Sequence, residues 1–80
     1  MTARSNSLAV RNPLVGLPGA AALAALPPDT KAALYTLLRS ISADARARAD
    51  KCWRTHKAPM ACYWKAVAVY AYHASRLVRA

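Results

Sequence analysis

The sequence predicts an all-α protein built around an antiparallel helical hairpin. Of its 80 residues 56% are hydrophobic, and 20 of them are Ala, the residue with the highest helix propensity. Two long segments lack both Gly and Pro and are separated by one short break at a proline. Val, Ile and Thr are few and no hairpin-turn dipeptide occurs, which argues against a sheet. We expect a flexible basic arm at residues 1–12 and a single small helical domain at 13–80.

The first expected helical element is short and lies near the N-terminus, at about residues 19–26. Gly and Pro residues precede it and Pro27-Pro28 follow it, so it has room for about two turns. An uncharged stretch of this length is too short to span a membrane. A signal peptide is the alternative, with Arg4 and Arg11 preceding the apolar run, but Pro18-Gly19 interrupts that run. We therefore expect a cytoplasmic protein, with export as the minority interpretation.

The second element is a long amphipathic helix at about residues 28–56. Pro28 suits a first helical position and Asp29 lies in the first turn, where its carboxylate meets the positive end of the helix dipole. At about 100° per residue the apolar side chains fall within one arc of the helix. The residues of that arc are Leu34, Leu37, Leu38, Ile41, Ala45, Ala49, Cys52 and His56.

The third element is a helix at about residues 59–78, and the short break at Ala58-Pro59 makes it an antiparallel neighbour of the second. It is apolar nearly all round, so one partner helix cannot cover it. We expect Tyr63, Trp64 and Tyr70 in the core. The spare face must meet the N-terminal segment, a second copy in a small bundle, or another partner. The residues of this candidate interaction face are Cys62, Val69, His73 and Leu77.

Residues that could perform chemistry are scarce, and the sequence predicts no enzyme, no cofactor and no small-molecule substrate. Only three carboxylates occur, and two have local partners: Asp44 four residues before Arg48, and Asp50 between Arg46 and Arg54. No phosphate-binding glycine loop, nucleophile elbow or paired metal-ligand spacing is present, so we expect no metal site. Cys52 and Cys62 flank the break, which leaves open a disulfide or two thiols.

The formal net charge of +9 is the strongest functional signal. Six Lys or Arg side chains form a band on the solvent side of the second helix, and Trp53 and Tyr72 lie at the edges of their apolar stripes as candidate contact residues. The band is Arg39, Arg46, Arg48, Lys51, Arg54 and Lys57. Such a band attracts polyanions, and exposed aromatic rings stack on bases, so nucleic acid is the favoured partner.

The alternative is a protein-interaction module or inhibitor of the kind that phages and mobile elements encode. It would dock on an acidic protein surface through the basic band and the spare apolar face of the last helix. A membrane-surface helix is less favoured, because the apolar stripe of the second helix already has a neighbouring helix to cover it.

Overall fold

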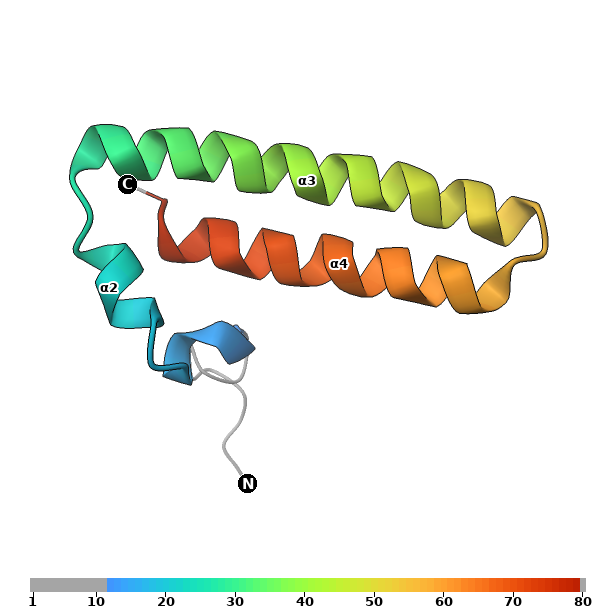
Figure 1. The fold of residues 1–80 in the computed structure, drawn as a ribbon, viewed down its shortest axis with the longest axis horizontal. Helices are drawn as coiled ribbons and strands as arrows, with labels where there is room; N and C mark the ends of the chain where they lie inside the picture. The colour runs from blue at the N-terminus through green and yellow to red at the C-terminus, as the bar shows by residue number, and fades with distance from the viewer. Residues whose placement is uncertain (1–11, 80) are drawn as a thin grey trace, which may run out of the picture.

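The chain is all-α, with a hairpin of two long helices and short helical turns before it. The computed structural model describes residues 12–79, in which no strand occurs. The elements are a 3₁₀ helix η1 (Pro13–Gly16), α2 (Ala20–Ala24), α3 (Pro28–Arg54) and α4 (Ala58–Leu77). Helices α3 and α4 lie side by side and antiparallel over the length of α4, and the N-terminal end of the longer α3 extends beyond it (Figure 1). The predicted hairpin is therefore confirmed, with helix ends within two residues of those expected.

Helix α3 ends in a turn that positions α4. His56 takes a left-handed backbone conformation with φ 63°. The amide of His56 donates to the carbonyl of Trp53 at 3.2 Å, and the amide of Lys57 donates to the carbonyl of Cys52 at 2.8 Å. This pair of bonds is the Schellman motif, which satisfies carbonyls left open at a helix end. Pro59 then lies in the first turn of α4, where its missing amide hydrogen costs nothing.

The seam between the two helices consists of small residues at alternating spacings of three and four, the heptad pattern of an antiparallel coiled coil. Its buried members are Ser42, Ala45 and Ala49 of α3 and Ala61, Ala68, Ala71 and Ser75 of α4. Because these side chains are small, the backbones approach closely. The Ser42 hydroxyl donates across the seam to the carbonyl of Ala68 at 2.8 Å.

The predicted apolar arc of α3 is wrong at three positions, since Leu37, Ile41 and His56 are exposed and His56 lies beyond the end of the helix. Leu37 is 55% exposed and Ile41 is 38% exposed, whereas Ser42 beside them is buried. The predicted arc runs through the most hydrophobic side chains of the helix. Helix α4 instead packs against the side of α3 where the side chains are smallest, because the two backbones approach most closely there. The expected burial of Tyr63 and Tyr70 is wrong for the same reason, since both rings project from a seam too narrow to enclose them and are more than half exposed. Trp64 is half-buried.

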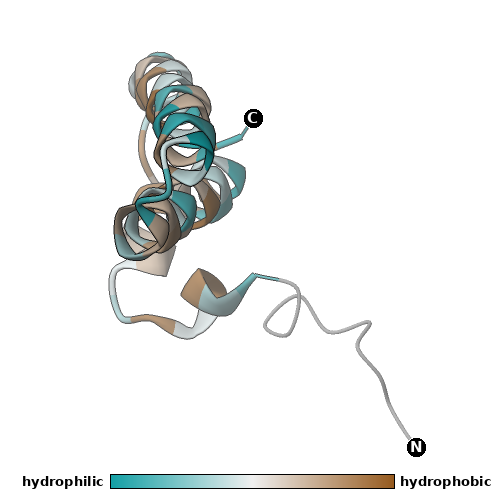
Figure 2. Cartoon of the chain, turned by 90° about the vertical axis from the view of Figure 1, so that its right-hand side faces the viewer, coloured by the Kyte–Doolittle hydropathy of each residue, from teal (hydrophilic) through white to brown (hydrophobic). Residues whose placement is uncertain are grey.

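The N-terminal segment packs against α4, on the side away from α3 (Figure 2). Two hydrogen bonds fix it. The Asn12 side chain donates to the carbonyl of His73 at 2.9 Å, and the Lys31 ammonium donates to the carbonyl of Ala24 at 3.1 Å. The predicted arm at residues 1–12 lies outside the described residues except for Asn12, and that residue is buried rather than part of an arm. This segment covers part of the spare face of α4.

Candidate nucleic-acid interface

The basic side chains of α3 do not form one band but lie on different sides of the hairpin. Residues seven apart on a helix are within about 20° of each other, so Arg39, Arg46 and Trp53 share one flank of α3. Arg48 is nine residues from Arg39 and therefore about 180° around the helix. The contacts agree, because the guanidinium of Arg39 lies 5.1 Å from the ring of Tyr72 while that of Arg48 lies 5.0 Å from the ring of Trp64.

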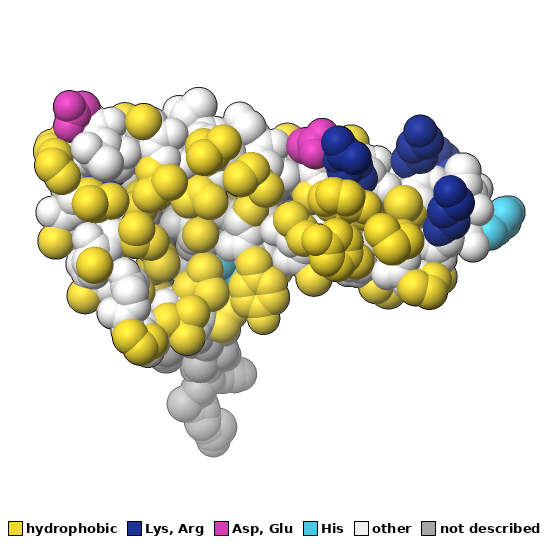
Figure 3. All heavy atoms as spheres, viewed as in Figure 1, with side chains coloured by type: hydrophobic (Ala, Val, Ile, Leu, Met, Phe, Trp, Pro, Cys, Tyr) yellow, Lys and Arg dark blue, Asp and Glu magenta, His cyan; other side chains and the backbone are white. Residues whose placement is uncertain are grey.

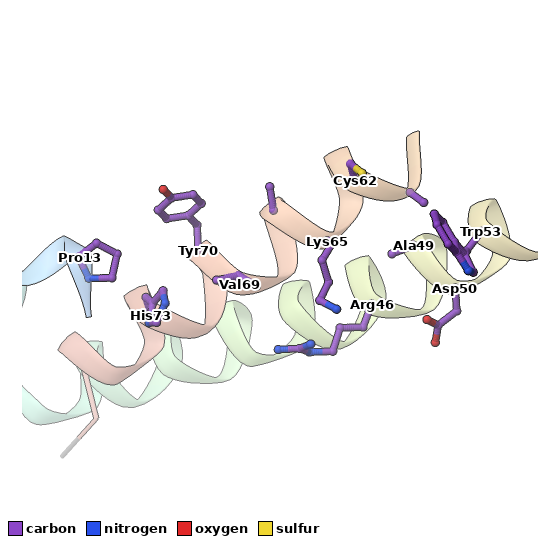
Figure 4. A pocket seen from close by; sticks show the side chains of 12 residues that line it. Pro13, Arg46, Ala49, Asp50, Trp53, Cys62, Lys65, Val69, Tyr70 and His73 are labelled. Atoms are coloured by element: carbon purple, nitrogen blue, oxygen red, sulfur yellow. The ribbon is translucent and has the colours of Figure 1, made fainter. Parts of the chain in front are cut away.

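An open groove of about 790 Å³ runs between α3 and α4 on the flank of Arg46 and Trp53 (Figure 4). Pro13 of η1 borders it at one end and Trp53 at the other. The remaining lining residues are Arg46, Ala49 and Asp50 of α3 and Ala61, Cys62, Lys65, Ala66, Val69, Tyr70 and His73 of α4.

Two cations face each other across this groove. The hydrogen bond from Ser42 to Ala68 sets the register, and one turn along from it Arg46 of α3 comes opposite Lys65 of α4. Both side chains extend into the space between the helices, and the Asp50 carboxylate points away from them (Figure 4). Two like charges at close range repel each other, and an anion held between them converts that repulsion into attraction to both.

The charge of the groove is not cancelled by the nearby carboxylate. The predicted pairing of Asp44 with Arg48 is confirmed, at 2.8 Å between carboxylate and guanidinium. The predicted pairing of Asp50 with Arg46 and Arg54 is wrong, since within residues 12–79 Asp50 takes part in no ion pair. Arg46 therefore keeps its charge available to a ligand.

Basic and aromatic side chains continue beyond the groove along α4. Arg76 donates a hydrogen bond to the Tyr72 hydroxyl at 3.2 Å, and the guanidinium of Arg39 lies 5.1 Å from the ring of the same tyrosine. The hydrogen bond from Arg76 stabilises the phenolate, and with the nearby positive charges of Arg76, Arg39 and Arg79 it lowers the pKa of Tyr72 below its ordinary value. The basic surface thus runs from Arg76 past Lys65 to the hairpin end.

The other predicted contact residues divide between this surface and the rest of the molecule. Trp53 borders the groove and is 66% exposed, as expected of a contact residue, whereas Tyr72 is half-buried between two arginines. Lys51, five residues from Arg46, points about 140° away from it. Arg54 and Lys57 are exposed at the hairpin end.

The candidate interaction face of α4 meets the basic flank of α3 in the same groove. Cys62, Val69 and His73 line it, but Leu77 does not. The sequence alone did not assign Lys65 and Arg76 to the interface with Arg46. Lys65, Val69, Tyr72 and Arg76 are spaced by three or four residues, so the sequence does place Lys65 and Arg76 on the same flank of α4. The side of α3 that this flank meets depends on the register between the two helices, which the sequence does not show.

Cys52 and Cys62 are both free thiols, so the disulfide left open by the sequence is absent. Within residues 12–79 no three His, Cys, Asp or Glu side chains gather closely enough to hold a metal ion. The same part of the chain contains no helix with the length and apolar character needed to cross a membrane.

Comparisons with protein-family models, with curated proteins and with solved structures each found no match to this chain.

Proposed function

We propose that the protein binds nucleic acid through the groove and the basic side chains that border it. The observation that carries the proposal is the opposition of Arg46 and Lys65 across the groove, with neither cation in an ion pair among residues 12–79. A phosphate between them receives charge-assisted hydrogen bonds from both helices at once. Such a contact positions the backbone of the nucleic acid without reading its sequence.

Arg39 and Arg76, held beside Tyr72, supply further phosphate contacts along the same flank. Trp53 at the other end of the groove offers an exposed ring on which an unpaired base can stack. Phosphate contacts in line with a stacking ring favour a single strand over a duplex, because only a single strand has base faces free to stack. We therefore expect a modest preference for single-stranded nucleic acid and little sequence discrimination.

The test is fluorescence anisotropy with labelled mixed-sequence single strands and duplexes over a range of salt. We expect log Kd to rise linearly with log salt, by about 0.7 for each phosphate contacted on a single strand. Arg46→Glu and Lys65→Glu should each weaken binding about tenfold or more, since each removes a hydrogen bond between charged groups and adds repulsion.

Lys51→Glu is the matched control, because it makes the same change in net charge at an exposed position about 140° away from Arg46. The two groove variants should lower the salt slope and the control should leave it nearly unchanged. Equal losses in all three variants would mean that net charge alone attracts the nucleic acid, and the groove would then have no specific role.

An acidic protein surface is the second candidate partner, and the groove's apolar floor favours it. Cys62 and Val69 line the groove on either side of Lys65 along α4 and would contact the apolar face of an acidic amphipathic helix. Such a partner resists salt better than nucleic acid does, because part of its affinity comes from apolar contact. If the protein does not bind nucleic acid at low salt, an acidic protein surface becomes the favoured partner.

A further inference from the structure

The flank of the hairpin opposite the groove is a broad apolar surface, which we call the apolar face. Its large exposed members are Leu37 and Ile41 of α3 and Met60 and Tyr63 of α4. Ile41 is seven residues before Arg48, whose guanidinium contacts Trp64, and the Tyr63 ring packs edge-on against Trp64 at 5.1 Å. Figure 3 shows hydrophobic atoms gathered on this side over both helices.

The interior of the hairpin buries few large hydrophobic side chains, so burial of the exposed ones would add to the stability of the fold. Within residues 12–79 the buried hydrophobic residues are six alanines and Val78. Burial of a large aliphatic or aromatic side chain stabilises a fold far more than burial of Ala, and chains of this size have little stability to spare. Large side chains such as Leu34, Leu38 and Trp64 are only half-buried in the hairpin, and the exposed ones of the apolar face can add to that burial on association.

The charges on the apolar face identify a second copy of the chain as its occupant. Arg48 beside this face is neutralised by Asp44 at 2.8 Å, whereas Arg46 and Lys65 of the groove lie on the opposite flank. Figure 3 shows the other Lys and Arg side chains of this side toward the hairpin end, so two chains with a net charge of +9 can meet along the middle of this face without bringing unpaired cations together. A strongly acidic or basic partner would find little free complementary charge along the middle of this surface.

The size of the apolar face fits the same occupant. Helix α4 has 20 residues, so the hairpin presents a surface about 30 Å long and about 20 Å wide across two helices. Two such surfaces bury roughly 1,200 Å² in total, at the lower end of stable protein interfaces. We infer that two copies pack their apolar faces together as a four-helix bundle, with both basic grooves turned outward.

Sedimentation equilibrium of the nuclease-treated protein at 0.5 M salt, from about 1 to 200 μM, tests the inference. High salt and nuclease remove association through bound nucleic acid, so failure of the proposed function and failure of dimerisation give separate results. We expect the mass of a dimer, with monomer appearing on dilution. A monomeric mass at every concentration, with the helical circular dichroism retained, would overturn the inference.

The variant Leu37→Gln/Ile41→Gln tests the surface. Gln has good helix propensity, and Leu37 and Ile41 are 55% and 38% exposed, so the hairpin loses only part of its internal contact and retained helical circular dichroism shows that it still forms. The dimer dissociation constant should rise about tenfold or more. Trp53→Gln is the matched control, replacing a large exposed hydrophobic residue at the groove, and should leave that constant unchanged. Dissociation by the control and not by the double variant would place the interface at the groove and refute the assignment.

Discussion

Tyr72 connects the two helices of the basic surface, because Arg39 of α3 and Arg76 of α4 both lie against its ring, at 5.1 and 5.9 Å. Stacked guanidinium groups keep their charge and lose part of their freedom of movement, which prepares them to contact phosphate. The tyrosine thus holds two cations in place on the same flank as Arg46 and Lys65.

Tyr72 should lose its proton at a lower pH than an ordinary tyrosine, because the hydrogen bond and positive charge of Arg76 lower its pKa. A lowered folded-state pKa stabilises the fold only in the ionised form. That contribution is absent at neutral pH, grows as the pH rises through the folded-state pKa, and is complete above about 10, the ordinary tyrosine value. Absorbance at 295 nm during an alkaline titration measures the ionisation of the tyrosine side chains.

In that titration Tyr72→Phe should remove the component with the lowered pKa and Arg76→Gln should move it toward the ordinary tyrosine value. Tyr63→Phe, at an exposed ring for which no arginine contact occurs in residues 12–79, is the control and should leave the component of Tyr72 unchanged. A titration curve that Arg76→Gln leaves unchanged would contradict the contact between Arg76 and Tyr72.

At the scale of the helices, the connection between α3 and α4 contains the backbone strain of the hairpin. His56 takes φ 63°, a region that costs a residue with a side chain about 1–2 kcal/mol and costs glycine nothing. Its side chain is exposed, so removal of the ring leaves no cavity. His56→Gly should raise the free energy of unfolding by about 0.5–1 kcal/mol, since glycine also gains entropy in the unfolded chain.

Urea denaturation of the His56 variants at one fixed protein concentration measures this effect. His56→Ala is the control, because alanine keeps the steric cost of the left-handed conformation while it removes the imidazole. It should be no more stable than the parent chain. A gain in stability by both variants would mean that the imidazole itself is unfavourable there, and backbone strain would not be the cause.

The sequence was sufficient to predict the long helices, because their starts and the break between them follow from local rules. Pro28 and Asp29 begin α3 and Pro59 lies in the first turn of α4, as the pattern indicated. The side of each helix that packs was less predictable. Ser42 is buried in the seam although it is polar, and Ile41 is exposed although it is hydrophobic. The small serine allows the two backbones to approach closely, and isoleucine at the same position would not. Opposition of Arg46 and Lys65 depends on the register between helices, which no local rule supplies.

At the scale of the whole molecule, the distribution of side chains separates two functions onto opposite flanks. The groove flank has Arg46, Lys65 and the paired arginines at Tyr72, while the apolar face has Leu37 and Ile41. The seam between them contains mostly alanine, so neither flank gives up large side chains to the hairpin interior. A dimer formed through the apolar face leaves each groove open on an outer surface.

Because dimerisation would supply the burial of large side chains that the seam lacks, folding and association should be coupled. The melting temperature should then rise with total protein concentration, as expected when the folded form is a dimer and the unfolded form a monomer. Circular dichroism melts at 0.5 M salt from about 2 to 200 μM measure this. Leu37→Gln/Ile41→Gln should lower the melting temperature at every concentration, whereas Trp53→Gln should follow the parent chain. A melting temperature independent of concentration in the parent chain would mean that the alanine seam alone stabilises the hairpin, and that the apolar face contributes nothing to its stability.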